Sequence, residues 1–218
     1  MISVSTILDD LFSLLSHYTI VNISGESGTG KTTLALYLGG NFLTSKKPYQ
    51  HSCIWIQASE IFPKRRLISL FSSNDEDLDY LSNNIYIIPE GRILKSFSEQ
   101  GQTLRKLINS DLVLPPNLKF IVIDNISHHL RFELSTLSEV RDITNTIDYF
   151  FDETLMPLLL FCKRKNIYLI LLHEVSFDMN AGQQKPFLQN LYSRLNVLHI
   201  NLSKIFNNKK KKMKITSE

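Results

Sequence analysis

The chain has 218 residues, 43% of them hydrophobic, which is enough for one domain with a sizeable core, expected over residues 1–218. The formal net charge is only +3, and six lysines between residues 204 and 214 supply much of the surplus, so composition alone does not indicate a nucleic-acid-binding protein. The first residues lack the basic start of a signal peptide and no apolar run is long enough to span a bilayer, which favours a soluble cytoplasmic protein over a secreted or membrane protein.

Hydrophobic patterns typical of helices and of buried strands alternate in the first half of the chain. Leucines recur at helical spacing before a β-rich run, and further short apolar runs are suited to buried parallel strands. Strands are expected at residues 18–23, 53–56 and 85–88, and helices at residues 8–15 and 31–38.

The same alternation continues in the second half. Strands are expected at residues 120–123 and 168–172, separated by a long helical stretch over residues 137–165. Pro157 is expected either to kink this stretch or to open a second helix. From residue 196 onward the pattern predicts a terminal antiparallel hairpin. The whole chain is therefore expected to be α/β, with a mainly parallel central sheet flanked by helices.

Residues 25–32, Gly-Glu-Ser-Gly-Thr-Gly-Lys-Thr, stand between a predicted strand and a predicted helix and have the P-loop pattern. Glycine-rich backbone can wrap a triphosphate closely, and the following helix adds its positive N-terminal end. Lys31 is expected to reach the β and γ phosphates, and the Thr32 hydroxyl to bind Mg²⁺. The residues expected to bind ATP are Gly25, Glu26, Ser27, Gly28, Thr29, Gly30, Lys31, Thr32 and Thr33.

Asp124 follows directly on the apolar run at residues 120–123. An acidic residue at the end of a buried strand is the second half of a P-loop site, where it holds Mg²⁺. We therefore expect Asp124 and Thr32 to form the metal site, although an aspartate that only ends a strand in a turn remains the alternative.

Four segments together resemble one family: residues 25–36, 55–67, 121–127 and 169–178. Their order and composition are similar to the ATPase core of the RecA-type recombinases, and within that superfamily to the archaeal RadB proteins, from about residue 5 to the end. The resemblance implies a RecA-like core, an archaeal source, and a role in homologous recombination and DNA repair. Only about two dozen residues precede the P-loop, so filament formation through an N-terminal domain is not expected.

The resemblance also implies that the loops after Asp124 and after the strand at residues 168–172 face DNA. On this interpretation residues 178–186 form the second DNA-facing loop, although a solvated connection of this composition needs no ligand. The lysines at residues 209–212 and 214 can lie on a phosphate backbone, but edge strands also carry lysines to oppose aggregation. Arg131 is a further candidate for contact with DNA or phosphate.

The catalytic pattern of the family is broken at two places. Where the family has a water-activating glutamate, an ungapped match places Ser59, and Glu60 comes one residue late. A one-residue slip in an extended segment turns a side chain to the other face, so Glu60 can act only if the backbone bulges. Lys31, Glu60 and Glu174 remain the catalytic candidates, and we expect ATP binding with slow or absent turnover.

The second break is His173-Glu174, which replaces the usual Asn-Gln and brings an anion toward phosphate. Glu174 is expected to be protonated, paired with a cation, or part of a rearranged Mg²⁺ or water site, or to be a surface glutamate if the strand register differs. Arg66 matches a position that stacks on adenine, or it belongs to a solvated helix start. His128 and His129 lack partners at ligand spacing and are expected to be loop residues near the nucleotide.

These observations favour an ATP-binding RecA-like accessory or mediator protein in homologous recombination and DNA repair. Its expected partners are single-stranded DNA and a recombinase or other repair protein, with no membrane, and its activity would be at most a slow DNA-modulated ATPase. The alternative is a regulatory ATPase of the KaiC-like or archaellum type, which binds proteins instead of DNA. A nucleotide kinase ranks last, because the chain has no arginine-rich lid segment.

Overall fold

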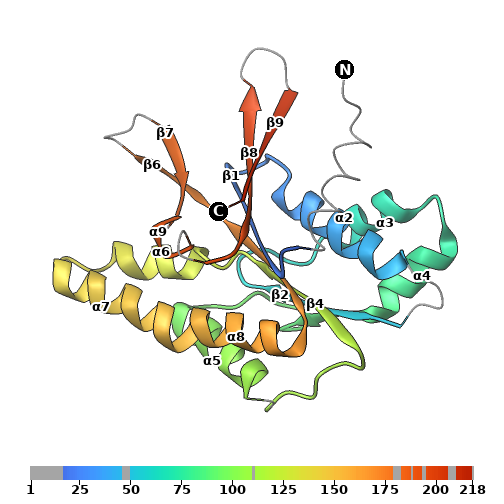
Figure 1. Ribbon diagram of the computed structural model, residues 1–218, viewed down its shortest axis with the longest axis horizontal. Helices are drawn as coiled ribbons and strands as arrows, with labels where there is room; N and C mark the ends of the chain where they lie inside the picture. The colour runs from blue at the N-terminus through green and yellow to red at the C-terminus, as the bar shows by residue number, and fades with distance from the viewer. Residues whose placement is uncertain are drawn as a thin grey trace.

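The computed structural model describes residues 17–45, 50–109, 111–178, 183–187, 189–192, 195–205 and 210–217. Within these ranges, a seven-stranded sheet lies between two layers of helices (Figure 1). The helix predicted at residues 8–15 lies outside the described residues. In this described part, no helix combines the length and apolar character needed to cross a bilayer.

The strands confirm the predicted mainly parallel sheet. Those of the large sheet are β1 (Ile20–Gly25), β2 (Ser52–Gln57), β3 (Ile85–Ile88), β4 (Leu118–Asp124), β5 (Tyr168–His173), β8 (Leu198–Ile205) and β9 (Lys210–Ser217). Their order is β3-β2-β4-β5-β1-β8-β9, and only β9 runs antiparallel to its neighbour. Because β5 lies between β1 and β4 and is parallel to both, the carboxyl ends of these three strands meet at one edge, where α/β proteins bind ligands.

The helices cover both faces of the sheet. They are α2 (Lys31–Thr44), α3 (Lys64–Phe71), α4 (Asp75–Asn84), α5 (Phe97–Ile108), α6 (His128–Ser135), α7 (Val140–Phe150), α8 (Met156–Lys165) and α9 (Gln189–Tyr192). Successive side chains of a strand point to opposite faces. In β4, Phe120 and Val122 therefore pack with α2, α3 and α4, whereas Ile121 and Ile123 pack with α5 and α8. Both faces are buried, which explains the unbroken apolar runs of these strands.

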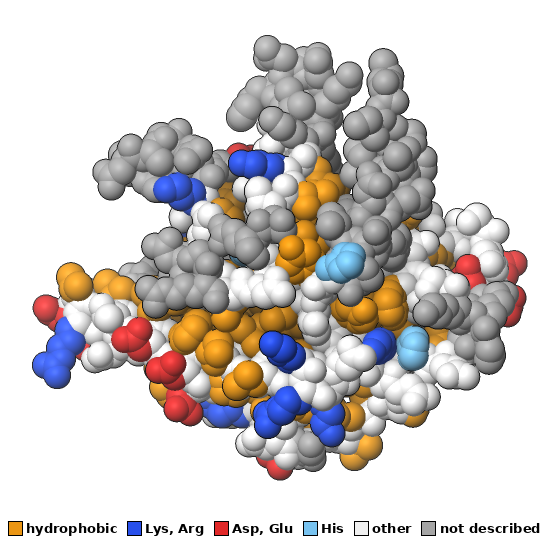
Figure 2. Space-filling view, viewed as in Figure 1, with side chains coloured by type: hydrophobic (Ala, Val, Ile, Leu, Met, Phe, Trp, Pro, Cys, Tyr) orange, Lys and Arg blue, Asp and Glu red, His pale blue; other side chains and the backbone are white. Residues whose placement is uncertain are grey.

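The helical stretch predicted at residues 137–165 consists of three parts. A π-helical turn (Phe151–Leu155) separates α7 from α8. Pro157 lies in the first turn of α8, directly after the π-helical turn, in a run of helical residues that is unbroken from Val140 to Lys165, so the missing backbone N–H falls where the regular α-helical hydrogen-bond pattern is already interrupted. Figure 2 shows hydrophobic side chains gathered over α7 and α8, where Val140, Tyr149 and Leu160 are exposed.

Two antiparallel hairpins project from the same side of the molecule (Figure 1). The first, β8–β9, is the predicted terminal hairpin, and β8 adds to the edge of the sheet beside β1. The second pairs β6 (Val175–Asp178) with β7 (Gln183–Pro186). The prediction of a loop over residues 178–186 is therefore wrong for its ends, which form cross-strand hydrogen bonds, while residues 179–182 lie outside the described residues.

Candidate nucleotide-binding site

A cavity of about 630 Å³ opens at the carboxyl edge of the sheet, over β1, β4 and β5. It is lined by Gly25, Glu26, Ser27, Gly28, Gly30, Lys31, Thr32, Thr33, Ser59, Glu60, Arg66, Asp124, Asn125, His128, Arg131, Glu174 and Val175. Nearly all residues predicted to bind nucleotide are thus brought together. Thr29 is the exception, because its side chain is buried and its hydroxyl donates to the Glu26 carbonyl, 2.8 Å away.

The phosphate loop has a backbone that glycine alone adopts easily. Gly25, Gly28 and Gly30 have φ angles of 154°, 76° and 101°. A Cβ atom on Gly25 would also overlap the carbonyl oxygen of Leu202 in β8. Helix α2 begins directly after Gly30, and its first residues, Lys31, Thr32 and Thr33, line the cavity, so its free N–H groups and positive end lie at the cavity.

Lys31 is held over the loop by the loop's own backbone. Its ammonium group donates to the carbonyl oxygens of Gly25, at 2.8 Å, and Glu26, at 3.0 Å. Burial lowers the pKa of Lys31, although the nearby carboxylates of Asp124 and Glu174 oppose that shift. A partly desolvated ammonium group at a helix N-terminus is well placed to bind phosphate.

The metal ligands predicted for Mg²⁺, Thr32 and Asp124, are in direct contact. The Thr32 hydroxyl donates to Oδ2 of Asp124 at 2.9 Å, and both side chains are buried. Burial raises the pKa of Asp124 to about 6, a shift that the Thr32 hydrogen bond only partly offsets. A buried carboxylate beside a hydroxyl is a donor set that suits Mg²⁺, whose charge would stabilise the ionised form, so these residues fit the ion.

The backbone directly after β2 is irregular at Ser59 and Glu60, the positions where a water-activating carboxylate is expected. The N–H groups of Ala58 and Ser59 both donate to the Asp124 carbonyl, at 2.8 and 3.1 Å. Consecutive N–H groups of a regular strand point in opposite directions, so the alternation of side chains is broken here. Ser59 and Glu60 accordingly both line the cavity, as does Arg66 from the first turn of α3.

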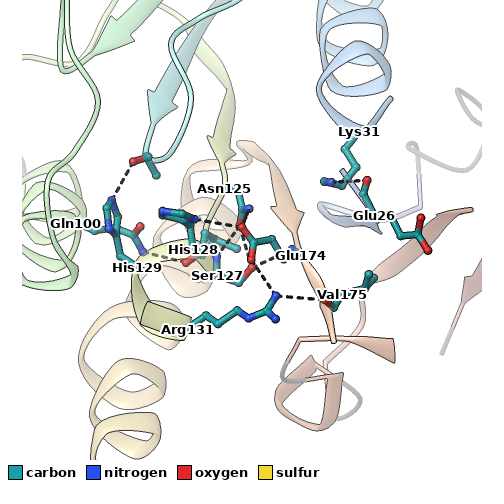
Figure 3. A network of polar contacts seen from close by, with 12 residues as sticks. Glu26, Lys31, Gln100, Asn125, Ser127, His128, His129, Arg131, Glu174 and Val175 are labelled. Carbon is teal, nitrogen blue, oxygen red and sulfur yellow. Dashed lines mark hydrogen bonds and ion pairs between the residues drawn. The ribbon is translucent and has the colours of Figure 1, made fainter. Parts of the chain in front are cut away.

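Glu174 is the centre of a polar network on the wall that faces the phosphate loop (Figure 3). Its Oε1 lies 3.1 Å from Nδ1 of His128 and accepts from the side-chain amide of Asn125 at 3.2 Å, and its Oε2 accepts from Nη1 of Arg131 at 3.1 Å. Burial favours the neutral carboxyl, but the hydrogen bonds and charges of His128 and Arg131 outweigh it and hold the pKa of Glu174 below its usual value. Of the alternatives expected for Glu174, the structure has the ion-paired one.

The expectation that His128 and His129 are loop residues is wrong, because both lie in the first turn of α6. Only His128 reaches the cavity. His129 is buried on the other side, where its Nε2 donates to the carbonyl of Ala58 at 2.9 Å. The segment between β4 and α6 is held by a hydrogen bond of 3.0 Å from the Gln100 side chain to the Ile126 carbonyl.

Two residues of this wall, Asn125 and Val175, were not predicted from the sequence. Asn125 directly follows the predicted metal ligand Asp124, and this adjacency was the available signal.

Of the lysine-rich segment, Lys209 and the side chains at 210–212 lie outside the described residues, and Lys214 is exposed on β9. Lys204 of β8 lies 4.0 Å from the carboxylate of Glu26 in the phosphate loop.

Comparison with known proteins agrees with this geometry. The family model described as "AAA domain" matches residues 14–171. The DNA repair protein RAD57 of Saccharomyces cerevisiae is 30% identical over 135 residues, which are 59% of this chain and 29% of that protein. The DNA repair and recombination proteins RadB of Thermococcus sibiricus and Pyrococcus furiosus are each 24% identical, over 79% and 78% of this chain and 66% and 65% of their own lengths.

The fold has a counterpart among solved structures. The crystal structure of the RadB recombinase superposes with a TM-score of 0.61 at 21% identity, covering 85% of this chain and 74% of that one. The chain spans less than two-thirds of the length of each of the three sequence relatives. The chain belongs to the AAA-domain family, and it is similar to the RadB recombinases in sequence and in fold.

Proposed function

We propose that this chain is an ATP- and Mg²⁺-binding protein that acts as an accessory or mediator in homologous recombination and DNA repair. The contact between Thr32 and Asp124 carries the nucleotide part of this proposal, because it joins the phosphate loop to the predicted metal-binding strand in one buried pair. Gly25, Gly28, Gly30 and Lys31 would hold the phosphates, with Thr32 and Asp124 as the Mg²⁺ ligands.

The role in repair is supported by what the relatives are named for, DNA repair and recombination. It is further supported by the position of the β6–β7 hairpin, which begins at Val175, a residue of the cavity wall. A nucleotide bound in the cavity would therefore act on the first residue of a projecting hairpin. We infer that nucleotide occupancy sets the affinity for single-stranded DNA or for a recombinase partner.

Hydrolysis is proposed to be slow. Glu60 is exposed and lines the cavity, so it remains the candidate to activate water. It has no hydrogen bond or ion pair with any other described residue that would fix its direction. A general base must be held within hydrogen-bonding distance of the attacking water, and a loosely held carboxylate does this for only a fraction of the time.

The test is the binding of fluorescently labelled single-stranded DNA, measured by anisotropy at two salt concentrations with and without Mg-ATP. The wild type is compared with Lys31→Ala, and with Lys163→Ala as a control that removes an exposed lysine of α8. Binding that weakens with salt, and that changes with ATP in the wild type and in Lys163→Ala but not in Lys31→Ala, supports the proposal. No DNA binding under any condition favours the KaiC-like or archaellum-type alternative, an ATPase that binds protein partners.

A further inference from the structure

The wall that faces the phosphate loop carries charges of both signs. Glu174, His128 and Arg131 line the same cavity as Lys31. Glu174 and Lys31 line this cavity together, and their opposite charges attract each other. An uncompensated carboxylate in that place would repel a terminal phosphate. The two neighbouring cationic side chains are therefore part of how this cavity can accept an anion.

We propose that Arg131, assisted by His128, binds the terminal phosphate of a nucleoside triphosphate, and that Glu174 holds Arg131 within reach and balances its charge. This assignment rests on the proposed function, because it concerns the same nucleotide site. It makes Arg131 the residue that distinguishes a triphosphate from a diphosphate, because a diphosphate lacks the terminal phosphate that Arg131 would bind.

Arg131 has N–H donors that are not used within the described residues and can bind a phosphate. Its Nη1 donates to Oε2 of Glu174 at 3.1 Å and to the carbonyl oxygen of Val175 at 3.3 Å. A guanidinium group has five N–H donors in a planar fork, and within the described residues the others form no side-chain hydrogen bond. The side chain is 47% exposed, so the remaining donors can form the paired hydrogen bonds that phosphate oxygens favour.

Glu174 is anchored from several sides, which makes it suited to position a neighbour. Its backbone N–H donates to the Ser127 hydroxyl at 3.0 Å, and its carbonyl accepts from the N–H of Phe187 at 3.0 Å. Asn125, which donates to Oε1, is itself fixed by hydrogen bonds from the hydroxyl and the N–H of Ser127 to its Oδ1, at 2.8 and 3.0 Å. The carboxylate is thus held in place before any ligand binds.

The start of α6 is fixed in the same way, which places Arg131 relative to the phosphate loop. On the side away from Glu174, Nε2 of His129 donates to the Ala58 carbonyl at 2.9 Å. The first turn of α6 therefore bridges the ends of β2 and β5, with Arg131 and His128 turned toward the cavity (Figure 3).

The test is a titration with methylanthraniloyl-labelled ATP and ADP in Mg²⁺, for the wild type, Arg131→Ala, Glu174→Gln and the double variant. Arg164→Ala, which removes an exposed arginine of α8, is the matched control. Arg131→Ala is expected to weaken ATP binding roughly 10- to 100-fold and to leave ADP binding within about twofold. Glu174→Gln keeps an acceptor for Arg131 but removes the anion, so it is expected to strengthen ATP binding several-fold.

The double variant shows whether Arg131→Ala weakens ATP binding by changing the charge of the cavity or by disturbing the fold. Removing the unpaired carboxylate should restore the part of the ATP affinity that repulsion costs in Arg131→Ala, but not the part that the arginine–phosphate contact supplies, whereas a misfolded wall would not be restored by a second substitution. Equal losses of ATP and ADP affinity in Arg131→Ala, or no recovery in the double variant, would overturn this inference and leave the proposed function standing. Failure of the wild type to bind either nucleotide would overturn both.

Discussion

The hydroxyl of Thr32 donates to the carboxylate of Asp124 across 2.9 Å, joining residues 92 positions apart in a buried pair. Burial raises the pKa of Asp124 to about 6, and the hydrogen bond from Thr32 opposes this rise. The carboxyl group is therefore buried but has a hydrogen-bond partner. It also places an unscreened carboxylate where a divalent cation would be most strongly attracted. The buried carboxylate of Asp124 thus lowers the stability of the fold and at the same time favours the binding of Mg²⁺.

Asp124→Asn should stabilise the folded chain at pH 8 and abolish the effect of Mg²⁺ on nucleotide binding. The pKa of Asp124 is raised from 3.8 in the unfolded chain to about 6, so the folded state is favoured below pH 3.8 by binding a proton, and this advantage is lost as pH rises through 6. Above pH 6 the buried carboxylate costs roughly 1 to 3 kcal/mol, which asparagine removes while still accepting from Thr32.

Urea unfolding at pH 8 and pH 4 measures this difference in the free energy of unfolding. Asp152→Asn, at an exposed position of the π-helical turn, is the control and should change little at either pH. An Asp124→Asn variant that is less stable than the wild type at pH 8 would contradict the assignment of a desolvated carboxylate.

His173→Asn should remove a source of acid sensitivity. His173 is fully buried, neither ring nitrogen has a hydrogen-bond partner among the described residues, and burial, with the nearby charges of His199 and Lys31, lowers its pKa to about 3. Between pH 3 and 6.5 the unfolded chain binds a proton that the folded chain does not. Stability is therefore complete above pH 6.5 and falls as pH decreases, by up to about 1.4 kcal/mol per pH unit.

The measurement compares the free energy of unfolding at pH 7 and pH 5 in the wild type, in His173→Asn and in His17→Asn, an exposed control. Differences between variants are used because Asp124 contributes a slope of the opposite sign in the same range. Identical slopes in the wild type and His173→Asn would show that His173 is not the titrating group.

Alanine substitutions at Gly25 and Gly39 should change the stability of the fold in opposite directions. Gly25→Ala places a methyl group against the Leu202 carbonyl at a φ of 154° and should destabilise the fold by about 1–3 kcal/mol while weakening nucleotide binding. Gly39 lies inside α2 with no atom within 4 Å of an added Cβ, so Gly39→Ala should instead stabilise by about 0.5–1 kcal/mol. Thermal unfolding of both variants checks the opposite signs.

Glu60→Gln should abolish the slow ATP hydrolysis that we propose and leave ATP affinity unchanged. Loss of a general base lowers turnover by roughly 10²- to 10⁴-fold, whereas phosphate binding depends on Lys31 and the loop. Phosphate release under single-turnover conditions is the measurement, with Glu90→Gln as an exposed control outside the cavity. Hydrolysis by Glu60→Gln at the wild-type rate would exclude Glu60 as the base.

Several helices could not be predicted although their start signals are present. Asn74 accepts from the N–H groups of Glu76 and Asp77 at the start of α4, and Ser96 accepts from Glu99 at the start of α5. These signals are local, but α3 and α4 have only 8 and 10 residues and bury only Leu67 and Phe71, and Leu81, so each offers few apolar positions from which a helical period can be recognised. The β6–β7 hairpin was missed for a different reason, because Gln183–Pro186 has almost no strand-forming composition and depends on its partner.

The sequence by itself determined the phosphate loop, Asp124 and the alternation of buried strands with helices, because each depends on residues that are neighbours in the chain. Only the tertiary structure decided that Glu174 is paired with His128 and Arg131, residues 46 and 43 positions away. That pairing exists because β4 and β5 lie side by side and end at the same edge of the sheet. The charge state of a carboxylate depends on which groups surround it in space, and the order of strands in a sheet supplies those groups.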